Sequence, residues 1–125
     1  MIELRRLDRD QLTSAYGVDS ERLLPWAALN APFEGAWCVL APGGASQPHA
    51  HHEYELFIAV SGRAVLEVDG ERRDFVAGDL VHLLPGSTHN VRNDSATEFE
   101  WYAVWWDSDL AAGFLARHAR VERAS

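Results

Sequence analysis

Two imidazoles and a carboxylate lie close enough together in this chain to bind one metal ion. His49, His51 and Glu55 all occupy odd-numbered positions, and residues of equal parity in an extended strand point to the same face. A continuous strand through this stretch would therefore place all three side chains on one side. Imidazole suits Zn²⁺, Cu²⁺, Fe²⁺ and Ni²⁺, while a carboxylate adds charge and tolerates Mn²⁺. The spacing predicts a site for a divalent metal.

A fourth ligand is available downstream. His89 follows a Pro85-Gly86 turn, so its strand can return beside the first three residues. Three imidazoles and one carboxylate leave about one or two coordination positions open, depending on the coordination number. An open position distinguishes a catalytic metal site from a closed structural one.

Two motifs in the sequence resemble those of the cupin superfamily. Residues 43–62 match the pattern G-x5-H-x-H-x3-E-x6-G in full, and residues 78–93 match G-x5-P-x-G-x2-H-x3-N. The one departure is Leu84, which stands where the family has proline, and Pro85 follows directly. The resemblance implies a jelly-roll β-barrel with one divalent metal per chain, bound by His49, His51, Glu55 and His89. The family uses this ligand set with several metals; we favour Zn²⁺, with Fe²⁺, Mn²⁺ and Ni²⁺ as alternatives.

A narrower resemblance concerns the reaction. The segment HAHHEYELF and the later WYAVWWD are similar to the zinc-binding cupin units of hydrazine synthetases. That similarity implies Lewis-acid chemistry, in which an ester between an amino acid and an N-hydroxy amino acid rearranges to form an N–N bond. It also implies a separate synthetase-like enzyme as a partner.

Three functions remain open at this point. The first is a metal-dependent enzyme that acts on a small molecule in secondary or amino-acid metabolism through Lewis-acid chemistry. The second is an Fe-dependent cupin dioxygenase, and the third is a non-catalytic cupin module that binds a small molecule. The identity of the metal separates the first two, and turnover separates both from the third.

The elements that must position the ligands are short strands. Turn signals every 8 to 12 residues are typical of a sandwich or barrel, and Asp69-Gly70 is the strongest hairpin signal. We expect one domain over residues 1–125, all-β, with the barrel over about 36–107. A short helix capped near Asp19 is expected through residues 22–24, and a C-terminal helix over about 109–120, capped by Ser108 or Asp109. The strands are expected at 36–41, 54–60, 63–68, 72–76, 80–84, 88–92 and 97–106.

Several side chains are candidates for contact with a substrate. Glu53 shares the parity of His51 and is a candidate general base. The strand over 97–106 has three tryptophans among its last six residues, which suggests a cavity walled by indole and phenol groups. Arginines are suited to binding a substrate carboxylate. The candidate substrate contacts are Arg63, Trp101, Tyr102, Trp105 and Arg92.

Composition limits the partners. The formal net charge of −8 argues against nucleic acid, which needs a basic face. No apolar run approaches the roughly 20 residues of a membrane span. The single cysteine, Cys38, excludes an internal disulfide and fits a cytoplasmic protein. Strand 54–60 is apolar on both faces, which predicts a second sheet or the partner of a homodimer over its outer face.

Overall fold

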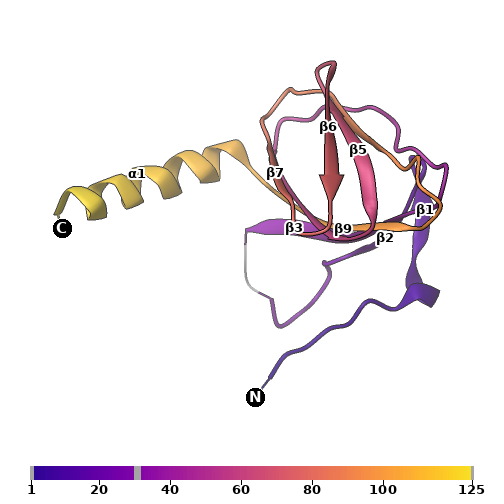
Figure 1. Ribbon diagram of the computed structural model, residues 1–125. Helices are drawn as coiled ribbons and strands as arrows, with labels where there is room; N and C mark the ends of the chain where they lie inside the picture. Colours follow the sequence, from indigo (N-terminus) through magenta and orange to yellow (C-terminus); the bar gives the residue numbers. More distant parts are fainter. Residues whose placement is uncertain (1, 30–31, 125) are drawn as a thin grey trace.

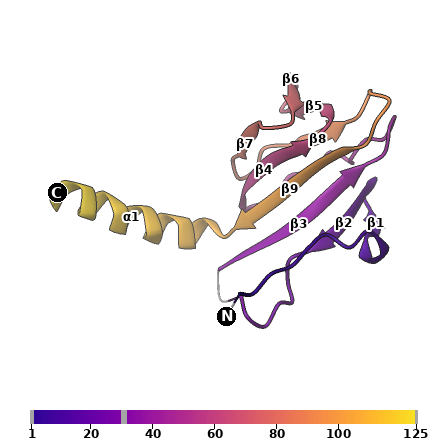
Figure 2. The ribbon, with the colours of Figure 1, turned by 60° about the horizontal axis from the view of Figure 1, so that its bottom comes forward.

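Two antiparallel sheets form the body of the molecule (Figures 1 and 2). The computed structural model describes residues 2–29 and 32–124. One sheet has the strand order β1-β2-β3-β9-β4-β7, and the other has the order β6-β5-β8. The strands are β1 (Thr13–Ala15), β2 (Val18–Arg22), β3 (Phe33–Leu40), β4 (Tyr54–Ser61), β5 (Arg63–Val68), β6 (Glu71–Val76), β7 (Leu80–Leu83), β8 (His89–Arg92) and β9 (Phe99–Trp106).

The core lies between the inner faces of the two sheets, as the alternation of the strands predicts. In β4, Glu55, Phe57 and Ala59 are buried, while Leu56 and Ile58 are only half-buried. In β9, Phe99, Trp101 and Ala103 are buried in the same way and Trp105 is half-buried. Strands β4 and β9 pair with Glu55 opposite Trp105. Side chains of both sheets meet in one cluster: Ala36, Cys38, Leu40, Phe57, Ala59, Ala64, Leu66, Phe75, Leu83, Val91, Phe99, Trp101 and Ala103. This is the all-β jelly-roll arrangement expected from the sequence.

The hairpin between β5 and β6 turns at Asp69 and Gly70. Both residues have positive φ, 49° and 84°, and two-residue loops of this kind match the right-handed twist of the flanking strands. The β5–β6 register runs without a shift from Arg63 opposite Val76 to Val68 opposite Glu71. The hairpin signal in the sequence therefore identified this connection correctly.

The short helix expected through residues 22–24 is wrong. Residues 18–22 form β2, which pairs with β1 on one side and β3 on the other. Tyr16 and Gly17, both with positive φ, turn the chain between β1 and β2. The open edge of β3 supplies backbone partners to this segment, and those hydrogen bonds override the local capping signal. The described helical turn near the N-terminus is η1 (Arg9–Gln11), capped by Asp8.

The metal-motif strand also begins later than a continuous strand would. β4 starts at Tyr54, so His49 and His51 lie in the loop before it. The loop enters through Pro48, which has no backbone N–H to donate to a ladder. Strand parity therefore does not bring the two histidines to Glu55.

Helix α1 (Ser108–Ala124) extends away from the barrel, as Figures 1 and 2 both show. Its cap is Asp107, whose Oδ1 accepts hydrogen bonds from the backbone N–H of Asp109 and Leu110. The expected cap at Ser108 or Asp109 is thus off by one or two residues. The Ser108 hydroxyl instead donates to the carbonyl of His52 at 2.6 Å. This hydrogen bond joins the start of α1 to the loop before β4. No helix among the described residues is long and apolar enough to cross a membrane.

Candidate metal centre

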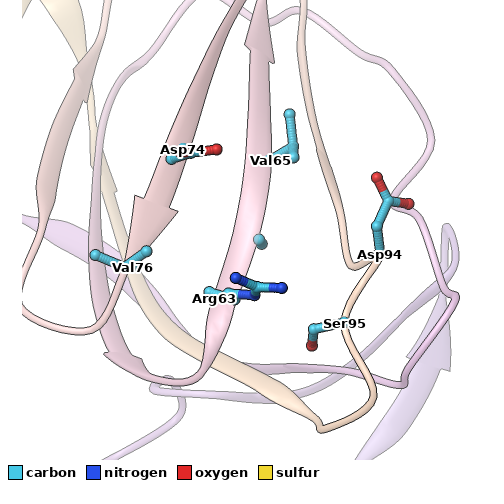
Figure 3. Close-up of a pocket in the computed structure, with 7 residues that line it drawn as sticks. Arg63, Val65, Asp74, Val76, Asp94 and Ser95 are labelled. Atoms are coloured by element: carbon cyan, nitrogen blue, oxygen red, sulfur yellow. The ribbon is translucent and has the colours of Figure 1, made fainter.

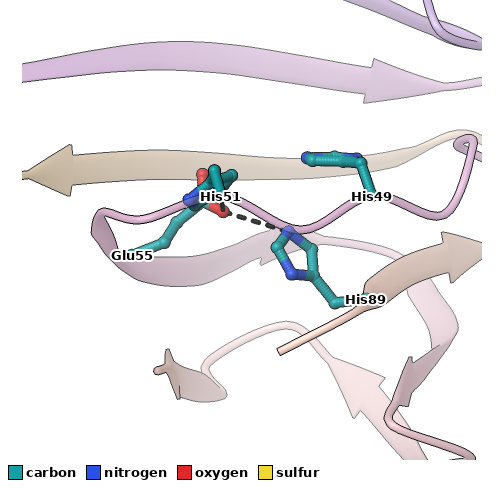
Figure 4. Close-up of side chains that lie close together, drawn as sticks. All are labelled: His49, His51, Glu55 and His89. Atoms are coloured by element: carbon teal, nitrogen blue, oxygen red, sulfur yellow. Dashed lines mark hydrogen bonds and ion pairs between the residues drawn. The ribbon is translucent and has the colours of Figure 1, made fainter. Parts of the chain in front are cut away.

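Four potential ligands converge from three parts of the chain. His49 and His51 come from the loop before β4, Glu55 from the start of β4, and His89 from the start of β8. One ligand atom from each residue lies within 4.8 Å of all the others. Figure 4 shows the four side chains facing one another at the barrel's edge.

The backbone fixes the relation between the first and last of these ligands. His49 and His89 form an isolated antiparallel bridge, with reciprocal N–H···O hydrogen bonds of 3.2 and 3.0 Å. Their ring centroids are 4.6 Å apart. The two sides of the site are therefore held together by main-chain hydrogen bonds that do not depend on a metal.

Two of the imidazoles have a defined orientation. His49 Nδ1 lies 3.0 Å from the carbonyl oxygen of Gln47, and His89 Nδ1 lies 3.4 Å from that of Ser87. A carbonyl accepts, so each Nδ1 is the donor of this hydrogen bond, and in the neutral imidazole the Nε2 then presents a lone pair. Hydrogen bonds of this kind set the tautomer of metal-binding histidines.

An unsatisfied nitrogen at the centre shows that the residues fit a cation. His89 Nε2 is buried and has no hydrogen-bond partner among the described residues. It lies 3.2 Å from Glu55 Oε1, and His51 Nε2 lies 3.1 Å from the same oxygen. With the proton on Nδ1, the His89 lone pair faces a carboxylate oxygen, which is an unfavourable pairing of two acceptors. A divalent cation between them would satisfy both groups, and the imidazole–carboxylate set suits Zn²⁺ or Fe²⁺.

The centre is dry on one side and open on the other. Glu55 and His89 are 5% and 2% exposed, and the Phe57 ring meets the His89 ring edge-on at 5.7 Å. His49 is exposed and His51 is half-buried, so a molecule from solvent can reach the cluster on the loop side.

Comparison with known proteins agrees with this geometry. The Cupin domain model matches residues 36–105, which include both histidine-bearing segments. The chain belongs to the cupin family.

Several solved structures resemble this cupin along most of its length. A Cupin 2 conserved barrel domain protein from Salinispora arenicola CNS-205 is 52% identical, with a TM-score of 0.83, over 94% of this chain and 99% of that one. The plu4264 protein from Photorhabdus luminescens is 39% identical, with a TM-score of 0.83, over 95% and 99%. The polyketide cyclase RemF from Streptomyces resistomycificus is 15% identical, with a TM-score of 0.67, over 82% and 79%, and shows a shared fold alone.

Glu53 lies behind a ligand of this cupin rather than beside the open side. Its Oε1 is 3.5 Å from Nδ1 of both His51 and His52, whereas the other nitrogen of His51 faces Glu55. The His51 ring thus separates Glu53 from the centre of the cluster. Glu53 therefore lies on the Nδ1 side of His51, and its role as a general base stays a prediction.

The tryptophan strand divides between the two faces of the large sheet. Trp101 and Trp105 lie on the inner face with Glu55, Trp101 deep in the core and Trp105 directly opposite Glu55. Tyr102 lies on the outer face, where its ring meets Trp37 edge-on at 5.3 Å. Burial raises the pKa of its phenol. The Tyr102 side chain therefore lies on the face of the sheet opposite to that of Glu55, and its contact with a substrate stays a prediction.

Arg63 and Arg92, the two candidate arginines, lie on the outer face of the small sheet. In β5 and β8 the neighbouring Ala64 and Val91 point into the core, so both arginines point outward from the small sheet. Arg63, Asp74 and Asp94 line a hollow of about 260 Å³, and Figure 3 shows their side chains. Arg92 Nε donates to Asp94 at 3.1 Å. This hollow is separated from the metal ligands by the barrel core.

One residue near the centre was missed by sequence reasoning. The Arg22 guanidinium lies over the Trp105 ring, with Cζ 4.9 Å from its centroid. The predicted helix through residues 22–24 concealed it, because its position becomes apparent only when β2 is placed beside β3.

Proposed function

We propose that this cupin is a metal-dependent enzyme that acts on a small molecule by Lewis-acid chemistry. One divalent metal is held by His49, His51, Glu55 and His89. The observation that carries the proposal is the convergence of these four ligands at buried His89, whose Nε2 has no hydrogen-bond partner among the described residues and lies 3.2 Å from Glu55 Oε1.

The surroundings of the cluster suit a catalytic metal better than a structural one. The barrel does not need a metal to close at this point, since the His49–His89 bridge already joins the two segments. A bound divalent metal would polarise an oxygen atom of the substrate. Glu55 offsets part of its charge, and the apolar rings of Phe57 and Trp105 keep water from the inner side, which strengthens electrostatic interactions there.

For the finer identity of the reaction we favour Zn²⁺ and the rearrangement of an amino-acid ester of an N-hydroxy amino acid that forms an N–N bond. A separate synthetase-like enzyme would supply this ester. Support comes from the similarity of HAHHEYELF and WYAVWWD to hydrazine synthetase cupins and from an imidazole-rich donor set, which suits zinc.

Elemental analysis of the protein purified without added metal tests the metal and its identity together. We expect about one zinc per chain, lost in His89→Ala. About one iron per chain with O₂ uptake would favour an Fe-dependent dioxygenase instead. No stoichiometric metal in the wild type, even after incubation with Zn²⁺, would contradict the proposal and favour a non-catalytic binding module.

Turnover is tested separately with the zinc-loaded protein. We expect the wild type to consume amino-acid esters of N-hydroxy amino acids at a rate well above that of the His89→Ala variant. Mass spectrometry measures the loss of the ester and the formation of product. An equal rate in the two proteins would show that the reaction does not need the site.

A further inference from the structure

Arg22 lies on the same face of the large sheet as Glu55, as the pairing of four adjacent strands shows. Strands β2, β3, β9 and β4 lie side by side (Figure 2), with Arg22 opposite the buried Ala36. Two residues before Ala36, Glu34 pairs with Trp105, which in turn pairs with Glu55. Residues two apart on a strand share a face, so Arg22, Trp105 and Glu55 all point to the inner face.

The guanidinium of Arg22 is held but not neutralised. It rests on the Trp105 ring, and such cation–π contacts orient arginine without using its N–H donors. Within residues 2–29 and 32–124, Arg22 forms no ion pair. Its donors therefore remain available to a ligand beside the cluster.

Glu34, the acid on the same face, is already engaged. Its Oε1 accepts hydrogen bonds from the backbone N–H of Leu24 at 3.0 Å and of Gly35 at 2.9 Å. These bonds tie the carboxylate to the chain between β2 and β3 instead of to Arg22. They also place a fixed negative charge at the edge of the site, which disfavours a doubly charged anion there.

A separate effect indicates that Arg22 and the metal ligand Glu55 act on the same interior region. The pKa of the buried Cys38 thiol is raised by desolvation and by the Glu55 charge, and lowered by the Arg22 charge. Cys38 faces inward opposite Trp101. Both charges are therefore close enough to the barrel interior to affect the pKa of the Cys38 thiol.

We propose that Arg22, supported by the face of Trp105, binds a carboxylate group of the substrate whose other end lies at the metal cluster. A single planar guanidinium matches a carboxylate through two parallel N–H···O bonds, and the fixed charge of Glu34 favours a monoanionic group over phosphate. The second half of this statement, that the other end meets the metal, rests on the proposed function. The first half, that Arg22 forms a carboxylate subsite, does not.

Calorimetric titration of the zinc-loaded and metal-free proteins with lactate and succinate tests the subsite. Lactamide and succinamide serve as uncharged analogues, and inorganic phosphate as a competing anion. We compare the wild type with Arg22→Gln, Arg22→Lys and Arg73→Gln. Arg73 is an exposed arginine on β6, so its replacement removes the same charge far from the site.

We expect Arg22→Gln to weaken binding of at least one carboxylate by about 10-fold or more, the usual effect of losing a charged hydrogen bond. Arg22→Lys should keep only part of the wild-type affinity for the carboxylate. Arg73→Gln should bind the carboxylate as tightly as the wild type does. Zinc content should stay at the wild-type level in all three variants, which separates this test from that of the metal site. Arg22-dependent carboxylate binding in a protein that holds no metal would support the subsite alone. The subsite is overturned if the wild type binds neither carboxylate, or if Arg22→Gln binds the carboxylates as tightly as the wild type does. It is also overturned if the amides bind as tightly as the acids, or if phosphate binds more tightly than both acids.

Discussion

His49 lies in the loop before β4 and His89 begins β8 of the small sheet, yet their backbones exchange two hydrogen bonds of 3.2 and 3.0 Å. The bridge joins the loop before β4 to the first residue of β8. It sets the two imidazoles with their centroids 4.6 Å apart before any ligand is bound. A centre arranged by main-chain hydrogen bonds should survive the loss of one side chain, because the bonds do not involve the rings.

The first prediction follows for His51, which comes from the same loop. We expect His51→Ala to lose stoichiometric metal while keeping most of its stability, since His51 is only half-buried. Zinc at about 1,000 times its Kd should stabilise the wild type by about 4 kcal/mol and the variant hardly at all. Differential scanning fluorimetry with zinc or with a chelator, together with metal analysis, provides the measurement.

His52→Ala is the matched control for this test. The His52 side chain is 80% exposed and its Nδ1 lies near Glu53, outside the cluster. It should bind metal and gain stability as the wild type does. Full metal occupancy in His51→Ala, or its loss in His52→Ala, would contradict the ligand assignment.

The sequence predicted the ligands of the site better than the way in which they are brought together. Spacing alone singled out His49, His51, Glu55 and His89, and the four do converge. Strand parity was the wrong reason for the two loop histidines, because β4 begins only at Tyr54. The placement of His49 depends on its bridge to His89, and the His51 carbonyl accepts a hydrogen bond from the backbone N–H of Gly86 at 2.8 Å. Both are long-range contacts that no local pattern encodes.

The faces on which the candidate substrate contacts lie were harder to predict, for a related reason. Alternation shows which residues share a face, but not which face turns inward. Phe57 and Ala59 are buried on the same face as Glu55, whereas Arg63 points away from the core and Tyr102 lies on the outer face of the large sheet. Arg22 was missed because β2 is set by pairing with β3, and its local sequence favours a helix cap.

The second prediction compares two glycines that have the same backbone conformation. Gly62 and Gly70 have φ of 83° and 84°. A Cβ at Gly62 would lie 2.5 Å from the carbonyl oxygen of Glu98, whereas one at Gly70 would have nothing within 4 Å. Both alanine variants carry the cost of positive φ, roughly 1–2 kcal/mol, and only Gly62→Ala adds an overpacking cost of about 1–3 kcal/mol. Urea unfolding should therefore rank Gly62→Ala below Gly70→Ala; equal stabilities would show that the chain near Glu98 yields without cost.

The third prediction gives Asn93, the last residue of the second motif, a structural role. It is fully buried, and its Nδ2 donates to the carbonyls of Leu40 at 3.0 Å and Thr97 at 2.8 Å. Its Oδ1 accepts from the backbone N–H of Ser95 at 3.0 Å. Asn93→Ala removes the Nδ2 donor from the carbonyl of fully buried Leu40, and an unsatisfied buried group costs about 1–3 kcal/mol. The lost hydrogen bonds to Thr97 and Ser95 add about 0.5–1.5 kcal/mol each.

Denaturant unfolding of Asn93→Ala should show a loss of about 2–4 kcal/mol, with metal per folded chain unchanged. Asn90→Ala on the same strand is the control, since Asn90 is half-buried and its side chain makes no hydrogen bond in the described structure. A variant at Asn93 that keeps its stability but loses metal would instead place this residue in the function of the site.

The fourth prediction concerns the reactivity of Cys38 and the alkaline limit of stability. Burial, reinforced by the Glu55 charge, raises the pKa of the thiol from 9.0 to about 12. The thiolate is the reactive form, so at pH 8 iodoacetamide should label Cys38 only after unfolding, as read by mass spectrometry. Between pH 9 and 12 the unfolded chain releases a proton that the folded chain keeps, so this thiol lowers the free energy of unfolding as the pH rises. Cys38→Ala should reduce that alkaline slope. Rapid labelling of the folded protein, or an unchanged slope in the variant, would mean that solvent reaches the barrel interior beside Trp101.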